Sequence, residues 1–104
     1  MDFQELQEKV FQNAIGYGEE YNVKIDEDFA LLKLTEEMGE FAQAVLIHRK
    51  KCRPEKYVSE EESKLEMGKE LADVVGMAIV NAKVLGIDLE EMLRVKWMKR
   101  SENK

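Results

Sequence analysis

Two pairs of acidic residues have the residue types and spacing of a cation site. Glu37 and Glu40 form the first pair, and Glu70 and Asp73 form the second. Side chains three positions apart on a helix point the same way, so each pair presents its carboxylates on one face. Oxygen ligands without histidine or cysteine nearby select Mg²⁺, Mn²⁺ or Ca²⁺ over zinc. Such a site is expected where the two pairs meet.

The second pair lies in a segment that is apolar around most of its circumference, which is the pattern of a buried helix. Within it, Glu66, Glu70, Asp73 and Asn81 share an arc of roughly 80° at about 100° per residue. Four carboxylates about 6 Å apart repel by roughly 3 kcal/mol per pair at an effective dielectric constant of about 20. A cluster of this kind needs protons, generous solvent or cations.

Ordinary surface carboxylates on a charged chain are the alternative interpretation of these acids. Lys33 would then pair with Glu37, and Lys69 with Asp73, each four residues apart along a helix. The two interpretations differ in where the lysines lie and in whether the acids are buried.

Hydrophobic periodicity and capping signals predict four helices and no strand. The first covers residues 2–15 and is expected to end at Gly16 and Gly18, and the second covers about 28–49. The third opens at Ser59 and runs to 85, and Asp88 opens a fourth. The expected fold is a single all-α domain over residues 1–104, an antiparallel four-helix bundle in which the second and third helices bring the acidic pairs together.

The apolar circumference of the third helix is too large for its neighbours in one chain to cover. A second copy could cover it, so a homodimer or a homotetramer built as a dimer of dimers is expected, with the site near the interface. The net charge of −6 argues against binding of a nucleic-acid polymer. A single cysteine, no apolar run of about 18 residues and an acidic amino terminus indicate a cytoplasmic protein without a membrane span.

The order and flanks of the acidic motifs resemble the all-α nucleoside triphosphate pyrophosphohydrolases of the MazG-like superfamily. Glu36-Glu37-Met38-Gly39-Glu40 is followed after 29 residues by Glu70-Leu71-Ala72-Asp73, and a Gly-Ile-Asp segment follows at 86–88. The resemblance covers roughly residues 3–95. In place of the aromatic residue that members often carry after the second motif, this chain has Gly76 and Met77.

The resemblance implies Mg²⁺-dependent hydrolysis of a nucleoside triphosphate to the monophosphate and pyrophosphate, with Mn²⁺ as a substitute ion. The matching metal ligands are Glu37, Glu40, Glu70 and Asp73. Glu36 is the catalytic candidate, which binds a further ion or positions the attacking water. The residues expected to contact substrate are Asn81, Lys96, Lys99 and Arg100.

Two other functions fit the same residues. Phosphoribosyl-ATP pyrophosphohydrolase of histidine synthesis is similar in its acidic cluster, and a non-catalytic helical partner protein could use the carboxylates to hold a structural ion. The substrate of the expected reaction carries a nucleobase. Four aromatic residues are candidates to stack on it, although such residues more often belong to a core or an interface; they are Tyr17, Tyr21, Phe29 and Trp97.

Overall fold

The computed structural model describes residues 1–98, and over that range it is all-helical, as predicted. The elements are α1 (Phe3–Tyr21), α2 (Glu27–His48), a single 3-10 turn η1 (Pro54–Lys56), α3 (Glu60–Leu85) and α4 (Leu89–Trp97). Among them, no helix combines the length and the apolar character needed to cross a membrane.

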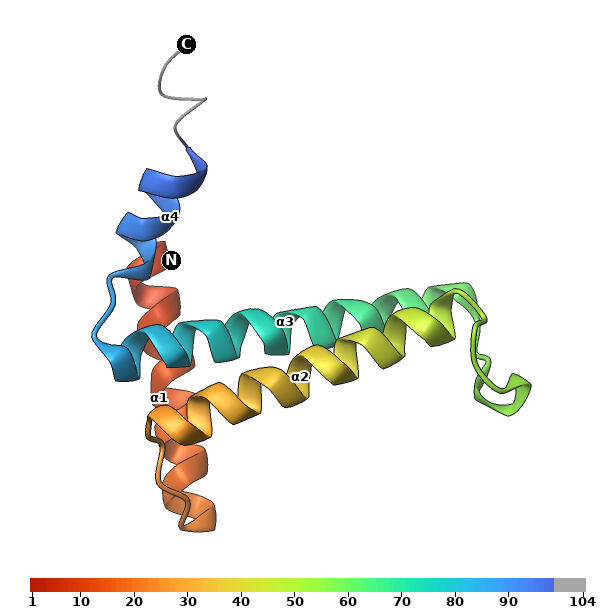
Figure 1. The fold of residues 1–104 in the computed structure, drawn as a ribbon, viewed down its shortest axis with the longest axis horizontal. Helices are drawn as coiled ribbons and strands as arrows, with labels where there is room; N and C mark the ends of the chain where they lie inside the picture. Colours follow the sequence, from red (N-terminus) through yellow and green to blue (C-terminus); the bar gives the residue numbers. More distant parts are fainter. Residues whose placement is uncertain (99–104) are drawn as a thin grey trace.

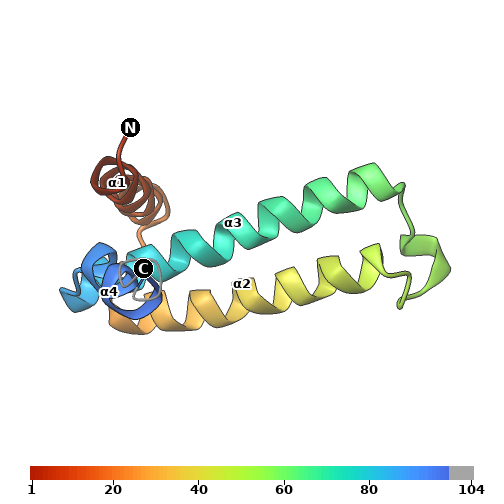
Figure 2. The same cartoon turned by 90° about the horizontal axis from the view of Figure 1, so that it is seen from above.

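Helices α2 and α3 form a long antiparallel hairpin, and η1 lies in the loop at its tip (Figures 1 and 2). The fully enclosed part of the core is small and lies mainly at the end of the hairpin away from this loop. Small side chains let helix axes approach closely where they pack. The buried apolar residues are Ala30, Ala44, Ile79, Val80 and Ala82.

Side-chain caps begin the helices where the sequence predicts them. Ser59 accepts a hydrogen bond from the Glu62 backbone N–H at 3.1 Å, and Asp88 accepts one from the Glu91 N–H at 3.1 Å. Each cap accepts a hydrogen bond from a backbone N–H that the helix itself leaves unpaired, which stabilises the folded protein by about 1 kcal/mol. Gly86 ends α3 in the left-handed conformation, with φ of 69°. The predicted boundaries of α3 are therefore confirmed.

The predicted end of the first helix is wrong, because α1 continues through Gly16 and Gly18 to Tyr21. Gly18 is buried, and the Val23 N–H donates to its carbonyl oxygen at 2.8 Å as the chain turns back over the helix. A Cβ at position 18 would lie 2.6 Å from the Val23 oxygen. Gly18 is therefore a packing requirement within the helix, and Asn22, with φ of 55°, provides the left-handed end.

A single chain does not close into the expected bundle. Helix α1 lies across one end of the hairpin and α4 projects from the same end (Figures 1 and 2), with Gln4 donating to Glu90 at 2.7 Å between them. The radius of gyration is 16.5 Å, against about 13 Å for a compact chain of this length. The exposed area is 8052 Å², against about 6000 Å² for a compact chain of 12.1 kDa.

The two glycines of α1 provide a matched test of this packing. We expect Gly16→Ala, where an added Cβ meets nothing within 4 Å, to raise the free energy of unfolding by about 0.5–1 kcal/mol. Gly18→Ala should lower it by about 1–3 kcal/mol, because the backbone oxygen of Val23 cannot move out of the way. Urea denaturation followed by circular dichroism measures both, and equal effects would contradict the packing role of Gly18.

Candidate metal centre

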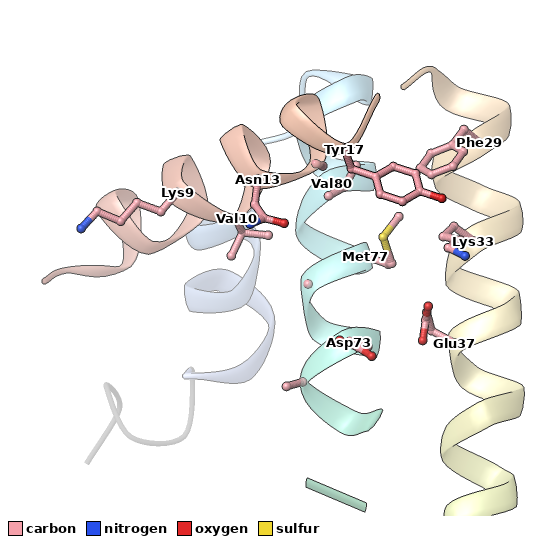
Figure 3. Close-up of a pocket in the computed structure, with 13 residues that line it drawn as sticks. Lys9, Val10, Asn13, Tyr17, Phe29, Lys33, Glu37, Asp73, Met77 and Val80 are labelled. Atoms are coloured by element: carbon pink, nitrogen blue, oxygen red, sulfur yellow. The ribbon is translucent and has the colours of Figure 1, made fainter. Parts of the chain in front are cut away.

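The hairpin brings acids from both of its helices together. One carboxylate oxygen from each of Glu37, Glu70 and Asp73 lies within 4.8 Å of the others. Glu37 and Asp73 face one another across the space between α2 and α3 (Figure 3). The fourth acid, Glu40, is exposed and lies outside this triad. It is close enough to raise the pKa values of both Glu37 and Glu70.

The triad is unusual because part of it is buried without a partner. Glu37 is only 9% exposed. The Oε2 atoms of Glu37 and Glu70 are buried and accept no hydrogen bond from residues 1–98. An unsatisfied buried polar atom costs about 1–3 kcal/mol, and more when it is charged, so folded proteins seldom leave one without a ligand or a function.

The electrostatics of the cluster favour protons or a cation. Burial raises the pKa of Glu37 to about 7, with further contributions from hydrogen bonding to Glu40 and from the negative charges of Glu40 and Asp73. Desolvation and the charge of Glu40 also raise the pKa of Glu70. Near neutral pH, the Glu37 carboxyl is therefore partly protonated, and a divalent ion would displace its proton.

The lysines that would neutralise ordinary surface carboxylates are engaged elsewhere. Lys33 donates to Glu36 at 2.6 Å, and Lys69 contacts Glu66 at 3.4 Å. Neither forms its expected ion pair with Glu37 or Asp73. Glu37 is buried and makes no ion pair with Lys33, so it is not a lysine-paired surface carboxylate, whereas Asp73 is exposed.

The donor set fits a hard divalent cation. Ligand oxygens on opposite sides of Mg²⁺ lie about 4.2 Å apart, because each Mg–O distance is about 2.1 Å. The 4.8 Å spread of the triad therefore needs only a small contraction around an ion. Three carboxylates leave coordination positions for water and substrate oxygens, as is usual for Mg²⁺.

A pocket opens on each side of the cluster. We call the larger of the two the aromatic pocket, and its volume is about 570 Å³. It reaches from Glu37 and Asp73 to α1 (Figure 3). Its lining also includes Asn13, Tyr17, Phe29 and Lys33. The other, the hairpin pocket, has a volume of about 430 Å³, lies toward the loop and is lined by Glu40, Gln43, Lys56, Glu62, Glu66 and Glu70. Both volumes lie in the range typical of small-molecule sites.

Other residues expected in the site lie apart from the triad. Glu36 is exposed and paired with Lys33. The Asn81 side-chain N–H groups donate to the Ala30 carbonyl at 2.8 Å and the Met77 carbonyl at 2.7 Å, so this amide ties α3 to α2 about 12 Å along the helix from Asp73. Lys96 is exposed on α4 and lines neither pocket. The expectations for Lys99 and Arg100 fall outside the described residues.

Sequence reasoning missed the contribution of α1. Lys9, Asn13 and Tyr17 recur every four residues, which is the spacing of one helix face, and all three line the aromatic pocket. The four-residue spacing is visible in the sequence, but a helix predicted to end at residue 15 does not include Tyr17.

Comparison of the chain with models of known protein families, with curated proteins and with solved structures finds no match. What the site can do must therefore be judged from its own geometry.

The raised pKa of Glu37 predicts how stability changes with pH. Between about 4.5 and 7, the folded chain binds more protons than the unfolded chain, so its free energy of unfolding should fall as pH rises through this window. The slope for this one group is at most about 1.4 kcal/mol per pH unit.

Chemical denaturation in the presence of a chelator, at a series of pH values, measures this slope. Glu37→Gln should flatten it, and saturating Mn²⁺ should reduce the loss of stability near pH 7, because the ion replaces the proton. A wild-type stability that rises with pH from 5 to 7 would contradict this assignment.

Proposed function

We propose that this protein is a metal-dependent nucleoside triphosphate pyrophosphohydrolase that releases pyrophosphate and a nucleoside monophosphate. The observation that carries the proposal is the pair of buried, unpartnered carboxylate oxygens on Glu37 and Glu70, in a cluster open to a pocket large enough for a small molecule. The order of the acidic motifs in the sequence supports the same reaction.

The acids would hold Mg²⁺, or Mn²⁺ in its place, through Glu37, Glu70 and Asp73, with Glu40 close enough to complete the set. When bound, the ion neutralises the polyphosphate and lowers the pKa of a water molecule. In the reaction, a water oxygen forms a bond to the α-phosphorus while the bond from that phosphorus to the bridging oxygen breaks. The water gives up a proton to a base, and the bridging oxygen leaves on pyrophosphate.

Glu36 has a different place in this proposal from the one expected from sequence. Its carboxylate holds the Lys33 ammonium at 2.6 Å, and Lys33 lines the aromatic pocket. Hydrogen bonding to Glu36 is the largest cause of the raised pKa of Lys33, which stays protonated. We therefore assign Glu36 as a positioning residue that keeps a cation at the pocket for the phosphates.

Pyrophosphate release is the direct test. The purified protein should release pyrophosphate from at least one class of nucleoside triphosphate with Mg²⁺ or Mn²⁺, and not with chelator. Asp73→Asn and Glu40→Gln should lower kcat at least a hundredfold, because each removes a charge from the cluster. Glu61→Gln makes the same charge change in the first turn of α3 and should retain activity.

Metal-dependent thermal stability without turnover of any nucleotide would overturn the proposal in favour of a structural ion. Turnover of phosphoribosyl-ATP alone would reassign the substrate.

A second copy of the chain is part of the proposal, because one chain leaves its hairpin uncovered. Met38 on α2 is 55% exposed, and Leu71 and Val75 on α3 are 46% and 51% exposed. At 100° per residue, these three and Leu31 lie on the side of the hairpin away from α1, and we call them the apolar face. The excess exposed area of about 2000 Å² per chain is what an obligate dimer interface buries.

Sedimentation equilibrium tests this pairing. Wild-type protein should be dimeric or tetrameric at micromolar concentration, and Met38→Glu should shift it toward monomer by placing a charge in the apolar face. Leu32→Glu is the matched control, because Leu32 is 69% exposed but points about 120° away from Met38 around α2. A monomeric wild-type protein would contradict the pairing.

A further inference from the structure

The two pockets that flank the acidic cluster differ in chemistry. Glu37 and Asp73 line the aromatic pocket, whereas Glu40 and Glu70 line the hairpin pocket. The hairpin pocket has four glutamates, one lysine and no aromatic residue in its lining. An uncharged, flat chemical group thus finds a favourable surface on only one side of the cluster.

That surface is built by Tyr17 of α1 and Phe29 of α2. Their ring centroids are 6.2 Å apart and their planes are inclined by 34°. The Tyr17 ring extends across the mouth of the pocket toward Lys33 (Figure 3), and the residue is 42% exposed. A partly exposed ring at a pocket mouth offers a face for stacking, and every nucleobase has such a face.

Asn13 lies one turn before Tyr17 on the same face of α1 and lines the same pocket (Figure 3). A carboxamide both donates and accepts hydrogen bonds, so it can pair with the edge of a base. Stacking on an aromatic ring combined with hydrogen bonding to a base edge is how proteins select unpaired bases.

We propose that the aromatic pocket holds the nucleobase of the substrate, an inference that rests on the proposed function. Tyr17 stacks on the base, and Asn13 forms hydrogen bonds with the edge of the base. The phosphates then extend past Lys33 toward Glu37 and Asp73, which line the same pocket. Specificity for the base therefore lies in α1, at positions distant along the chain from the acids that would hold the metal.

Calorimetric titration in Mn²⁺ with two ligands tests this assignment. One ligand is a nucleoside triphosphate made inert by an α,β-methylene bridge, and the other is inorganic tripolyphosphate, which has no base. Wild-type protein should bind the preferred nucleotide at least tenfold more tightly than tripolyphosphate. Tyr17→Leu should remove about tenfold of that preference, because stacking is lost, and should leave the affinities for Mn²⁺ and tripolyphosphate unchanged.

Three further variants sharpen the result. Tyr17→Phe keeps the ring and should keep the preference, which also guards against misfolding of the leucine variant. Asn13→Asp removes a donor and should change the ranking of the four bases. Tyr21→Leu is the matched control, because this ring lies 4.9 Å from Tyr17 by centroid but does not line the pocket.

Each outcome separates the two proposals. If nucleotide and tripolyphosphate bind equally well to the wild type, or if Tyr17→Leu keeps the preference, base recognition by this pocket is overturned while polyphosphate binding stands. If neither ligand binds although Mn²⁺ does, the proposed function itself is overturned.

Discussion

Glu37 is buried between two helices and against other acids, and the packing of both helices has to accommodate its carboxylate. Its carboxylate is nearly enclosed, one of its oxygens has no partner within residues 1–98, and the negative charges of Glu40 and Asp73 raise its pKa while the charge of Lys33 lowers it. An isolated buried carboxylate avoids this cost by taking a proton, which is the meaning of a pKa near 7. A divalent ion removes the same cost for several carboxylates at once. The fold holds oxygens of Glu37, Glu70 and Asp73 within 4.8 Å of one another, although like charges there repel.

Apolar packing and two hydrogen bonds join α2 and α3 on either side of the acids. Ala30 and Val80 bury the end of the hairpin that lies near α1, where the Asn81 amide bonds to the Ala30 carbonyl. At the loop end, His48 and Ser63 make a hydrogen bond of 2.7 Å between the helices. The acids lie between these two anchors. Repulsion among them then acts against a spacing that both ends of the hairpin already fix.

Local signals in the sequence were sufficient for the bounds of α3 and for the acids that α2 and α3 bring together. Capping at Ser59 and Asp88 and the spacing of the two acidic pairs depend only on residues a few positions apart, so they can be recognised without a structure. The path of α1 could not be recognised in this way. Glycine disfavours helix interiors, so Gly18 indicates a helix end in the sequence. In the structure, Val23 and Ile25 lie close to Gly18 instead, and that contact exists only after the chain has turned back. Asn81 likewise shares its arc with Glu70 in the sequence, yet its partner is a carbonyl 51 residues away.

The sparse core connects the site to the pairing of chains. In the proposed assembly, a second copy would cover the apolar face that one chain leaves exposed. The same two helices hold Met38 and Val75 on one side and Glu37 and Asp73 toward the other. Whatever sets the spacing of α2 and α3 at the apolar face therefore also sets the distance between the acids.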